Sequence, residues 1–164
     1  RYGHDAEPLI RKLFALDYAD KYAVSYGGAF DMVRHPKHPF IFATLDGRLT
    51  EVKTGRKGIL EIKTTSILRS MQKEKWWKDG KPAIPDQYYC QVLWQMIASG
   101  FDFAVLHAQF RYEYGEEPRF ERRTYTIERE DVADDLAYLE AAGVKFWTEN
   151  VMGGREPDLI LPEI

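Results

Sequence analysis

Two carboxylates and an amine in the first half of the chain have the types and spacing that could do chemistry. Asp46 precedes Glu61 by fifteen residues, and Glu61 precedes Lys63 by two. Because side chains alternate along a strand, the segment GILEIKTTS would point Glu61 and Lys63 to one face and its apolar side chains to the other. A solvated surface ion pair is the simplest explanation of so short a motif.

A site for a divalent cation is the alternative explanation of these charges. Carboxylates crowded at one sheet edge repel each other unless a cation compensates them. Mg²⁺ prefers a pair of carboxylates and retains waters, and the backbone carbonyl of Ile62 is a further available oxygen ligand. Such ions activate a phosphodiester for hydrolysis, and an ammonium such as that of Lys63 offsets charge in the transition state. The arrangement suits a nuclease, although D-x14-E-x-K is weak evidence by itself.

A strand pair must bring these residues together. The segment PFIFATLDGRLTEVKTGRKGILEIKTT predicts a hairpin. Its first strand is expected over 40–45, with a turn at Asp46-Gly47 and a basic segment over 53–57 before the second strand. Paired in this way, the two arms would place Asp46 and Glu61 within reach of each other across the sheet.

The rest of the chain predicts helices on either side of that hairpin. An amphipathic helix is expected from Asp5 to about Tyr18, capped by His4 or Asp5, followed by one or two strands within 21–39. The other expected elements are a helix over 66–77, a strong helix after Pro85 that stops at Gly100, a hairpin over 101–128, and a last helix over 129–150 anchored by Val132, Leu136, Leu139, Phe146 and Trp147. The fold class is α/β, a mixed sheet flanked by helices.

Composition restricts the class of protein. With 164 residues, 45% of them hydrophobic, the chain suits one domain over residues 1–164 that buries roughly 68–70% of its unfolded surface. Its one cysteine, Cys90, excludes an intrachain disulfide and cysteine-cluster metal sites, which favours a reducing, cytoplasmic setting. No apolar stretch is long enough to span a membrane. The net charge of −3 argues against a uniformly basic surface for nucleic acid.

Four segments occur in an informative order: GHDAEPLIRKLFA, FATLDGRL, GILEIKTTS and IPDQYYCQVLWQM. Over about residues 3–110 they resemble the PD-(D/E)XK nuclease superfamily, and within it the YqaJ-like viral recombinase family that includes the lambda-type exonucleases. The resemblance implies a restriction-endonuclease-like core and a Mg²⁺- or Mn²⁺-dependent deoxyribonuclease that uses two ions. It further implies a 5′-to-3′ exonuclease on double-stranded DNA, acting in phage-type recombination in a bacterial or phage-infected cell.

The resemblance also implies roles for individual residues. Asp46 matches the first metal-binding aspartate, Glu61 the second carboxylate and Lys63 the catalytic lysine. Three further positions match residues that face or line the site, namely Glu7 on the opening helix and the helical pair Tyr88 and Gln91. Two features depart from the family: Leu45 stands where a proline is usual, and the chain begins almost at Gly3, where lambda-type enzymes have an N-terminal region that grips the DNA end.

Several other residues have two interpretations. Phosphate contact is the role we expect for a group beside the carboxylates: Arg48, Arg56, Lys57, Thr64 and Ser66. Trp76 and Trp77 could stack on bases or serve as packing anchors, with equal support. For His35 and His38 in HPKHP, a surface turn is favoured over metal ligation, and for Gln95 a helix flank with satisfied amide groups.

Three functions remain open at this level. The first is the exonuclease, which in this family pairs with a single-strand annealing protein and forms a ring trimer in the lambda-like branch. The second is a structure-selective or nicking endonuclease of the same superfamily. The third is a catalytically silent DNA-binding subunit, against which the intact set of carboxylates and lysine argues, because a silent protein has no physical reason to retain crowded charges.

Overall fold

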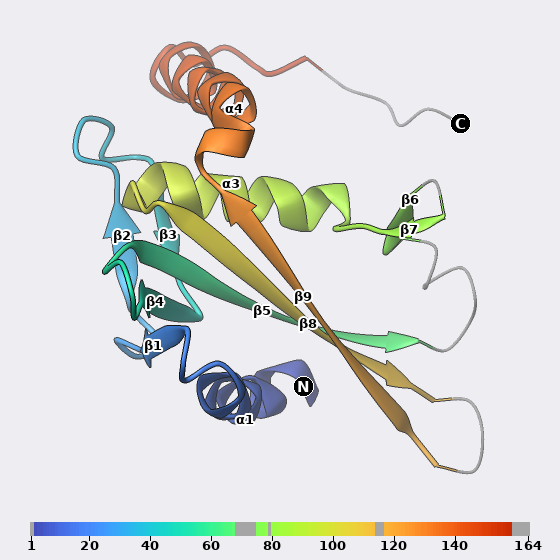
Figure 1. The fold of residues 1–164 in the computed structure, drawn as a ribbon. Coiled ribbons are helices and arrows are strands. Elements are labelled where there is room, and N and C mark those ends of the chain that lie inside the picture. The colour runs from blue at the N-terminus through green and yellow to red at the C-terminus, as the bar shows by residue number, and fades with distance from the viewer. Residues whose placement is uncertain (1, 68–74, 79, 114–116, 159–164) are drawn as a thin grey trace.

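The computed structural model describes residues 2–67, 75–78, 80–113 and 117–158. Its main element is a five-stranded sheet in the order β1-β4-β5-β8-β9 (Figure 1). These strands are Tyr22–Ser25 (β1), Gly47–Glu51 (β4), Lys57–Ile67 (β5), Phe103–Tyr112 (β8) and Arg119–Glu128 (β9). Two small sheets pair Met32–Arg34 (β2) with Phe42–Thr44 (β3) and Trp77–Lys78 (β6) with Lys81–Pro82 (β7).

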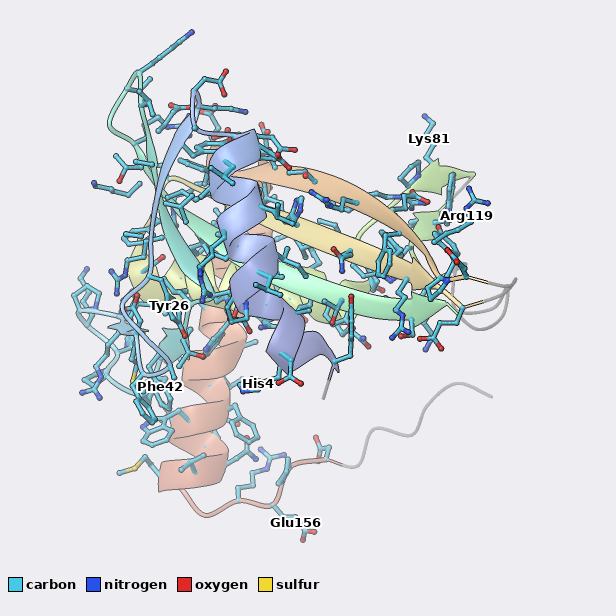
Figure 2. All side chains as sticks on the ribbon, turned by 90° about the horizontal axis from the view of Figure 1, so that it is seen from below. His4, Tyr26, Phe42, Lys81, Arg119 and Glu156 are labelled. Atoms are coloured by element: carbon cyan, nitrogen blue, oxygen red, sulfur yellow. The ribbon has the colours of Figure 1, made fainter. Side chains whose placement is uncertain are left out.

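Helices cover both faces of the main sheet. Helix α1 (Tyr2–Asp17) lies against one face and α3 (Asp86–Ser99) against the other, with α4 (Ala133–Phe146) packed beyond α3 (Figure 1). Figure 2, seen from below, shows α1 running across the strands. A 3₁₀ turn, η1 (Glu130–Val132), precedes α4, and a π-helical segment, η2 (Trp147–Met152), follows it. The predicted mixed α/β fold is confirmed, and no helix in the described ranges is long and apolar enough to cross a bilayer.

Strands β5 and β8 form the parallel pair of the sheet, and α3 lies on the crossover between them. The other pairs in this sheet, β1–β4, β4–β5 and β8–β9, are antiparallel. Strand β8 is buried along nearly its whole length. Its apolar sequence FAVLHAQF fits this position, because a strand with helices on both faces has no solvated side.

The sheet separates two hydrophobic clusters. On the α3 side the cluster includes Ile59 and Leu106, and on the α1 side it includes Leu60, Ile62 and Val105. The alternation predicted for GILEIKTTS is therefore confirmed. Glu61 and Lys63 do not face solvent, however, but lie on the side that α3 covers, so the solvated surface pair is the wrong interpretation.

Sequence signals define the α3 helix at both ends. Pro85 precedes its first residue, and Gly100 ends it in the left-handed conformation, with φ of 69°. The Gly100 N–H donates to the Met96 carbonyl at 2.9 Å, which satisfies one of the last carbonyls of the helix. The helix after Pro85 and the hairpin over 101–128, observed as β8 and β9, are confirmed predictions.

The sequence predicts that the strand over 40–45 pairs with the strand of GILEIKTTS, and this pairing is wrong. Strand β3 pairs with β2 in a separate sheet, and β4 is the strand that pairs with β5. Leu45 and Asp46 therefore join β3 to β4, which begins at Gly47, and the chain reverses at 52–56. Gly55 makes this turn possible, because it adopts a φ of 75° while its N–H donates to the Glu51 carbonyl.

Three helix predictions need correction. Helix α1 begins at Tyr2, so His4 and Asp5 lie inside it and do not cap it. The predicted helix over 66–77 lies mostly outside the described residues, but Ser66 belongs to β5 and Trp77 to β6. Of the expected anchors of the last helix, Leu136 is buried, and Val132 and Leu139 pack partly buried against the cluster on the α3 side, so these three are confirmed. The predicted anchors that are exposed are Phe146 and Trp147.

Candidate active site

The candidate site lies where strand β5 extends beyond its neighbour β4. The β4–β5 register ends at the pair Gly47 and Leu60, so the following residues of β5 pair with β8 alone in the described main sheet. On this open side the Ile62 N–H donates to Asp46 Oδ2 at 2.8 Å. Because the N–H and C=O of a strand residue point to the same side, the Ile62 carbonyl faces the same edge. The sequence prediction that Asp46 and Glu61 meet is thus correct in outcome, although β4 supplies the neighbouring strand.

The Glu61 carboxylate is the most enclosed acidic group at this edge. Its side chain is 2% exposed. Oε1 accepts from Lys63 Nζ at 2.7 Å and from Gln91 Nε2 at 2.7 Å, while Oε2 accepts from Gln95 Nε2 at 2.6 Å. Donors from β5 and from two turns of α3 thus fix both oxygens of the carboxylate.

The Lys63 ammonium is held by three groups. Its Nζ lies 2.7 Å from Glu61 Oε1, donates to Gln91 Oε1 at 2.8 Å, and lies 4.8 Å from the centre of the Tyr88 ring. Tyr88 and Gln91 are three residues apart and therefore occupy one side of α3. The structure brings together four of the predicted site residues on this face: Glu61, Lys63, Tyr88 and Gln91.

Helix α1 contributes Glu7 through an arginine. Arg11, 9% exposed, donates from Nη1 to Glu7 Oε1 at 3.0 Å and to the Asp46 backbone carbonyl at 2.6 Å. Its guanidinium also lies 3.5 Å from the centre of the Tyr26 ring. Arg11 therefore ties the helix to the start of β4. Sequence reasoning missed this residue, and its position one helical turn after Glu7 is the signal that would have suggested the ion pair.

Crowding of negative charge dominates the electrostatics of this edge. Burial, followed by the charges of Glu61 and Glu7, raises the pKa of Asp46 from 3.8 to about 7, against the opposing effects of the Ile62 N–H and Lys63. Asp46 therefore keeps a proton up to about neutral pH, and a bound cation would relieve the same repulsion. Carboxylate and carbonyl oxygens are hard ligands of the kind that Mg²⁺ and Mn²⁺ prefer, so the donor set fits such an ion.

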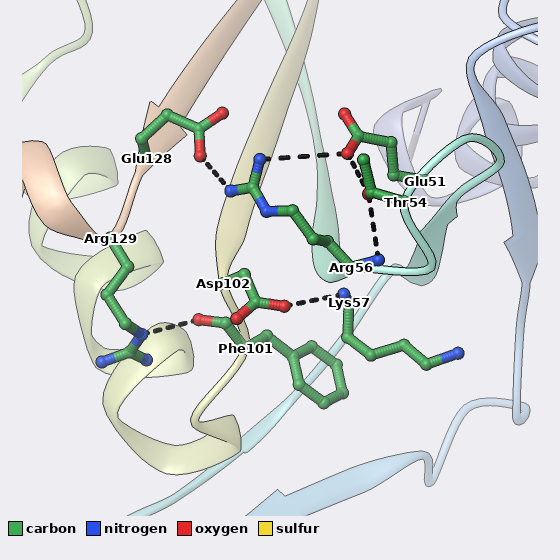
Figure 3. A network of polar contacts seen from close by, with 8 residues as sticks. All are labelled: Glu51, Thr54, Arg56, Lys57, Phe101, Asp102, Glu128 and Arg129. Atoms are coloured by element: carbon green, nitrogen blue, oxygen red, sulfur yellow. Dashed lines mark hydrogen bonds and ion pairs between the residues drawn. The ribbon is translucent and has the colours of Figure 1, made fainter.

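Two of the predicted phosphate-binding residues lie away from these carboxylates. Arg56 pairs with Glu128 and approaches Glu51 at 3.9 Å (Figure 3). Lys57 Nζ donates to Thr50 Oγ1 at 2.9 Å. Lys57 stands four residues before Glu61, which is about 13 Å along a strand. The structure does not bring this pair to the site, and their contact with phosphate stays a prediction.

The other predicted phosphate contacts differ in their accessibility. Arg48 is bound to Asp31, with Nε donating to Oδ2 at 2.8 Å. Thr64 packs under the start of α1, since a Cβ added at Gly3 would lie 2.5 Å from Thr64 Oγ1. Ser66 is exposed near the end of β5. Of this group, Ser66 and Thr64 are the two that follow Lys63 directly on the open strand.

Trp76 and Trp77 differ in how far they are buried. Trp76 is 2% exposed and lies in the core, with its ring 4.9 Å from that of Phe110, so it is a packing anchor and cannot stack on a base. Trp77 is half-buried, and the Arg123 guanidinium lies 4.9 Å from its ring centre.

A second cluster of potential ligands lies between β2 and α4. His35 and His38 stack with ring centres 5.0 Å apart, and their Nε2 atoms lie 3.5 and 3.8 Å from Glu140 Oε1. His35 Nδ1, however, accepts backbone N–H bonds from Lys37 and His38. The proton of a neutral His35 ring must then sit on Nε2, where a metal would need a lone pair. The cluster therefore forms a polar contact between this turn and α4.

Gln95 is the main residue that sequence reasoning assigned wrongly. It is 2% exposed, not at the flank of the helix, and its Oε1 has no hydrogen-bond partner among the described residues. The sequence shows that Gln95 lies one helical turn after Gln91. Because the residues around it are apolar, however, nothing in the sequence indicated that its side chain contacts Glu61.

Three comparisons with known proteins each give a match. The sequence model described as the YqaJ-like viral recombinase domain matches residues 1–102. The "Uncharacterized protein YqaJ" of Bacillus subtilis (strain 168) is 32% identical over 133 residues, which cover 78% of this chain and 35% of that protein. The present chain thus spans about a third of that relative's length.

The third match is a solved structure. The crystal structure of an alkaline exonuclease (LHK-Exo) from Laribacter hongkongensis superposes with a TM-score of 0.51 at 17% identity, covering 94% of this chain and 74% of that one. At such low identity the likeness concerns the fold. It agrees with the mixed sheet and its flanking helices and is consistent with the PD-(D/E)XK-like core expected from the sequence.

Proposed function

Because the chain belongs to the YqaJ-like viral recombinase domain family, we propose that it is a divalent-metal-dependent deoxyribonuclease. The observation that carries the proposal is the open edge of β5, where Asp46 approaches the strand that bears Glu61 and Lys63. The buried Glu61 carboxylate contacts the Lys63 ammonium and lies beside Asp46, whose pKa is raised. Such an arrangement costs the fold free energy, and it is typical of sites that act on phosphate.

The oxygen atoms at this edge would hold the metal. Asp46, Glu61 and the Ile62 carbonyl are the direct candidates, with Glu7 facing them from α1. When bound, Mg²⁺ or Mn²⁺ would polarise the phosphodiester and lower the pKa of a water, and a second ion would stabilise the leaving oxygen. Without a bound ion, a proton on Asp46 would reduce the negative charge that Asp46, Glu61 and Glu7 place at this edge.

Lys63 would act on the water and the phosphate. Its side chain is 18% exposed, so it reaches solvent while three neighbours restrain it. Held in this way, it would orient the attacking water or neutralise charge that develops on the phosphate. Gln91 bridges Lys63 and Glu61, and the Tyr88 ring offers its negative face to the ammonium.

We extend the proposal to substrate and partners on family grounds. Double-stranded DNA is the proposed substrate and 5′-to-3′ exonucleolytic degradation the proposed reaction, and the solved structure that shares the fold is that of an alkaline exonuclease. A single-strand annealing protein is the proposed partner, and a homotrimer is the proposed assembly.

Matched linear and covalently closed duplex DNA test the proposal. We expect Mg²⁺ to support loss of the linear form alone, EDTA to stop it, and Asp46→Ala to abolish it. Asp17→Ala is the matched control, because Asp17 is an exposed carboxylate paired with Arg122. Labels on the 5′ or 3′ ends then give the polarity. Cutting of both forms would indicate an endonuclease, and cutting of neither would overturn the catalytic proposal in favour of a DNA-binding subunit.

A further inference from the structure

The Gln95 amide touches both segments that carry the acidic residues. Its Nε2 donates to Glu61 Oε2 at 2.6 Å and to the Thr44 carbonyl at 3.1 Å. Thr44 is the last residue of β3 and stands two residues before Asp46. Because both partners are acceptors, the amide nitrogen and not the oxygen must face them. One NH₂ group thus connects β5 to the start of the Asp46 segment.

Packing alone does not explain an amide at this position. Gln95 is 2% exposed among the apolar residues of α3, and its Oε1 lacks a hydrogen-bond partner within the described residues. A buried acceptor without a donor costs free energy that a methionine of similar length would avoid. The two donated hydrogen bonds are the compensating gain, and both are directed toward the candidate site.

Gln95 and Gln91 hold different parts of the same carboxylate. Gln91 and Lys63 both donate to Oε1 of Glu61, whereas the described contacts give Oε2 a single donor, Gln95. Gln91 is exposed at the site, so it can contact substrate or water. Gln95 is buried behind the carboxylate and cannot, so any effect that it has must pass through Glu61 and Thr44.

We propose that Gln95 is a positioning residue that orients the Glu61 carboxylate and sets the separation of Asp46 and Glu61. The inference rests on the proposed function, since it assigns to Gln95 the geometry of the proposed metal ligands. A residue behind a ligand typically changes metal affinity or activity by about 10- to 100-fold when it is replaced.

Replacing Gln95 with methionine tests this role, because methionine keeps the length of the side chain and removes both donors. Calorimetric titration of the metal-free protein with Mn²⁺ should give a dissociation constant about 10- to 100-fold higher than that of the parent. With linear duplex DNA, kcat should fall while KM for DNA stays unchanged. Gln95→Asn, one methylene too short to reach Glu61, should give the same two changes and serves as a second variant should the first fold poorly.

Gln109→Met is the matched control. Gln109 is also a buried amide, and it donates to the Tyr2 hydroxyl at 3.1 Å, away from Glu61. This variant should keep the parent's Mn²⁺ affinity and kcat. Equal losses in Gln109→Met and Gln95→Met would indicate general loosening and overturn the positioning role.

The remaining outcomes separate the two proposals. If the parent binds Mn²⁺ and cuts DNA, and Gln95→Met does both as well as the parent, the positioning role is overturned and the proposed function stands. If the parent neither binds Mn²⁺ nor cuts DNA, both are overturned. A kcat that falls together with an unchanged Mn²⁺ affinity would also count against Gln95 as a residue that sets ligand spacing.

Discussion

Replacing Asp46 with asparagine should stabilise the metal-free protein, and more strongly at pH 8 than at pH 5. Asparagine keeps an oxygen that can accept the Ile62 N–H but carries no charge. It therefore removes the repulsion from Glu61 and Glu7 together with the cost of burying an ionised group. A substitution that abolishes a proposed metal ligand would thus strengthen the fold.

The magnitude follows from the pKa of Asp46. In the unfolded chain Asp46 ionises near 3.8, whereas in the folded protein its pKa is about 7. Between these values the folded state binds more protons than the unfolded state, so the contribution of Asp46 to stability falls as pH rises. The ionisation cost reaches about 4 kcal/mol at pH 8 and about 2 kcal/mol at pH 5, since one pKa unit corresponds to about 1.4 kcal/mol. Asparagine should recover these amounts.

Urea denaturation in the presence of EDTA at the two pH values measures this difference. Asp17→Asn is the control, because Asp17 lies on the surface and its replacement should change the free energy of unfolding little at either pH. A gain for Asp46→Asn that is the same at pH 5 and pH 8, or a loss at pH 8, would show that charge crowding at the open edge of β5 has been misjudged.

Three further predictions concern the lysine, a buried histidine and a glycine. Lys63→Ala should abolish cleavage while gel-shift titrations show unchanged DNA binding, and retained cleavage would refute its role. Burial, followed by the charge of Arg122, lowers the pKa of His107 to about 4. Between about pH 6.5 and pH 4, His107 therefore binds a proton in the unfolded chain but not in the folded protein. The free energy of unfolding should fall by about 3 kcal/mol from pH 6.5 to pH 4. In His107→Leu the fall measured by urea denaturation should be smaller, and an equally steep fall would contradict this assignment. Gly58→Ala should cost about 1–3 kcal/mol in urea denaturation, because a Cβ there would lie 2.3 Å from the Phe103 ring; Phe103→Leu should restore part of the loss, and no recovery would contradict the clash.

The features predicted correctly from the sequence are those with strong local signals. Pro85 and Gly100 mark the ends of α3, and the alternation in GILEIKTTS predicts which β5 side chains share a face. Partner choice between strands carried no such signal. Strands β3 and β4 are short neighbours of three and five residues, and only tertiary pairing decides that β3 joins β2 while β4 joins β5.

The site itself was predictable in part. Asp46, Glu61 and Lys63 followed from type and spacing, and their family resemblance supplied Glu7, Tyr88 and Gln91. Arg11 and Gln95 were not identified, because each acts through a contact distant in sequence. Arg11 reaches the Asp46 carbonyl across 35 residues, and Gln95 reaches Glu61 across 34. The periodicity of apolar residues predicts which face of a helix or strand a residue occupies, but it does not identify the residue that it contacts in another element.

The parallel pairing of β5 with β8 also decides when the site can form during folding. The pairing of Gly58 with Phe103 closes a loop of about 45 residues, and the contacts of Glu61 with α3 span 30 and 34 residues. Closure over such a separation is entropically costly and slow compared with forming a local hairpin such as β8–β9. Contacts between Glu61 and α3 therefore belong to a late stage of folding. Cation binding at this edge should then slow unfolding and leave the folding rate nearly unchanged, which makes it a source of kinetic stability.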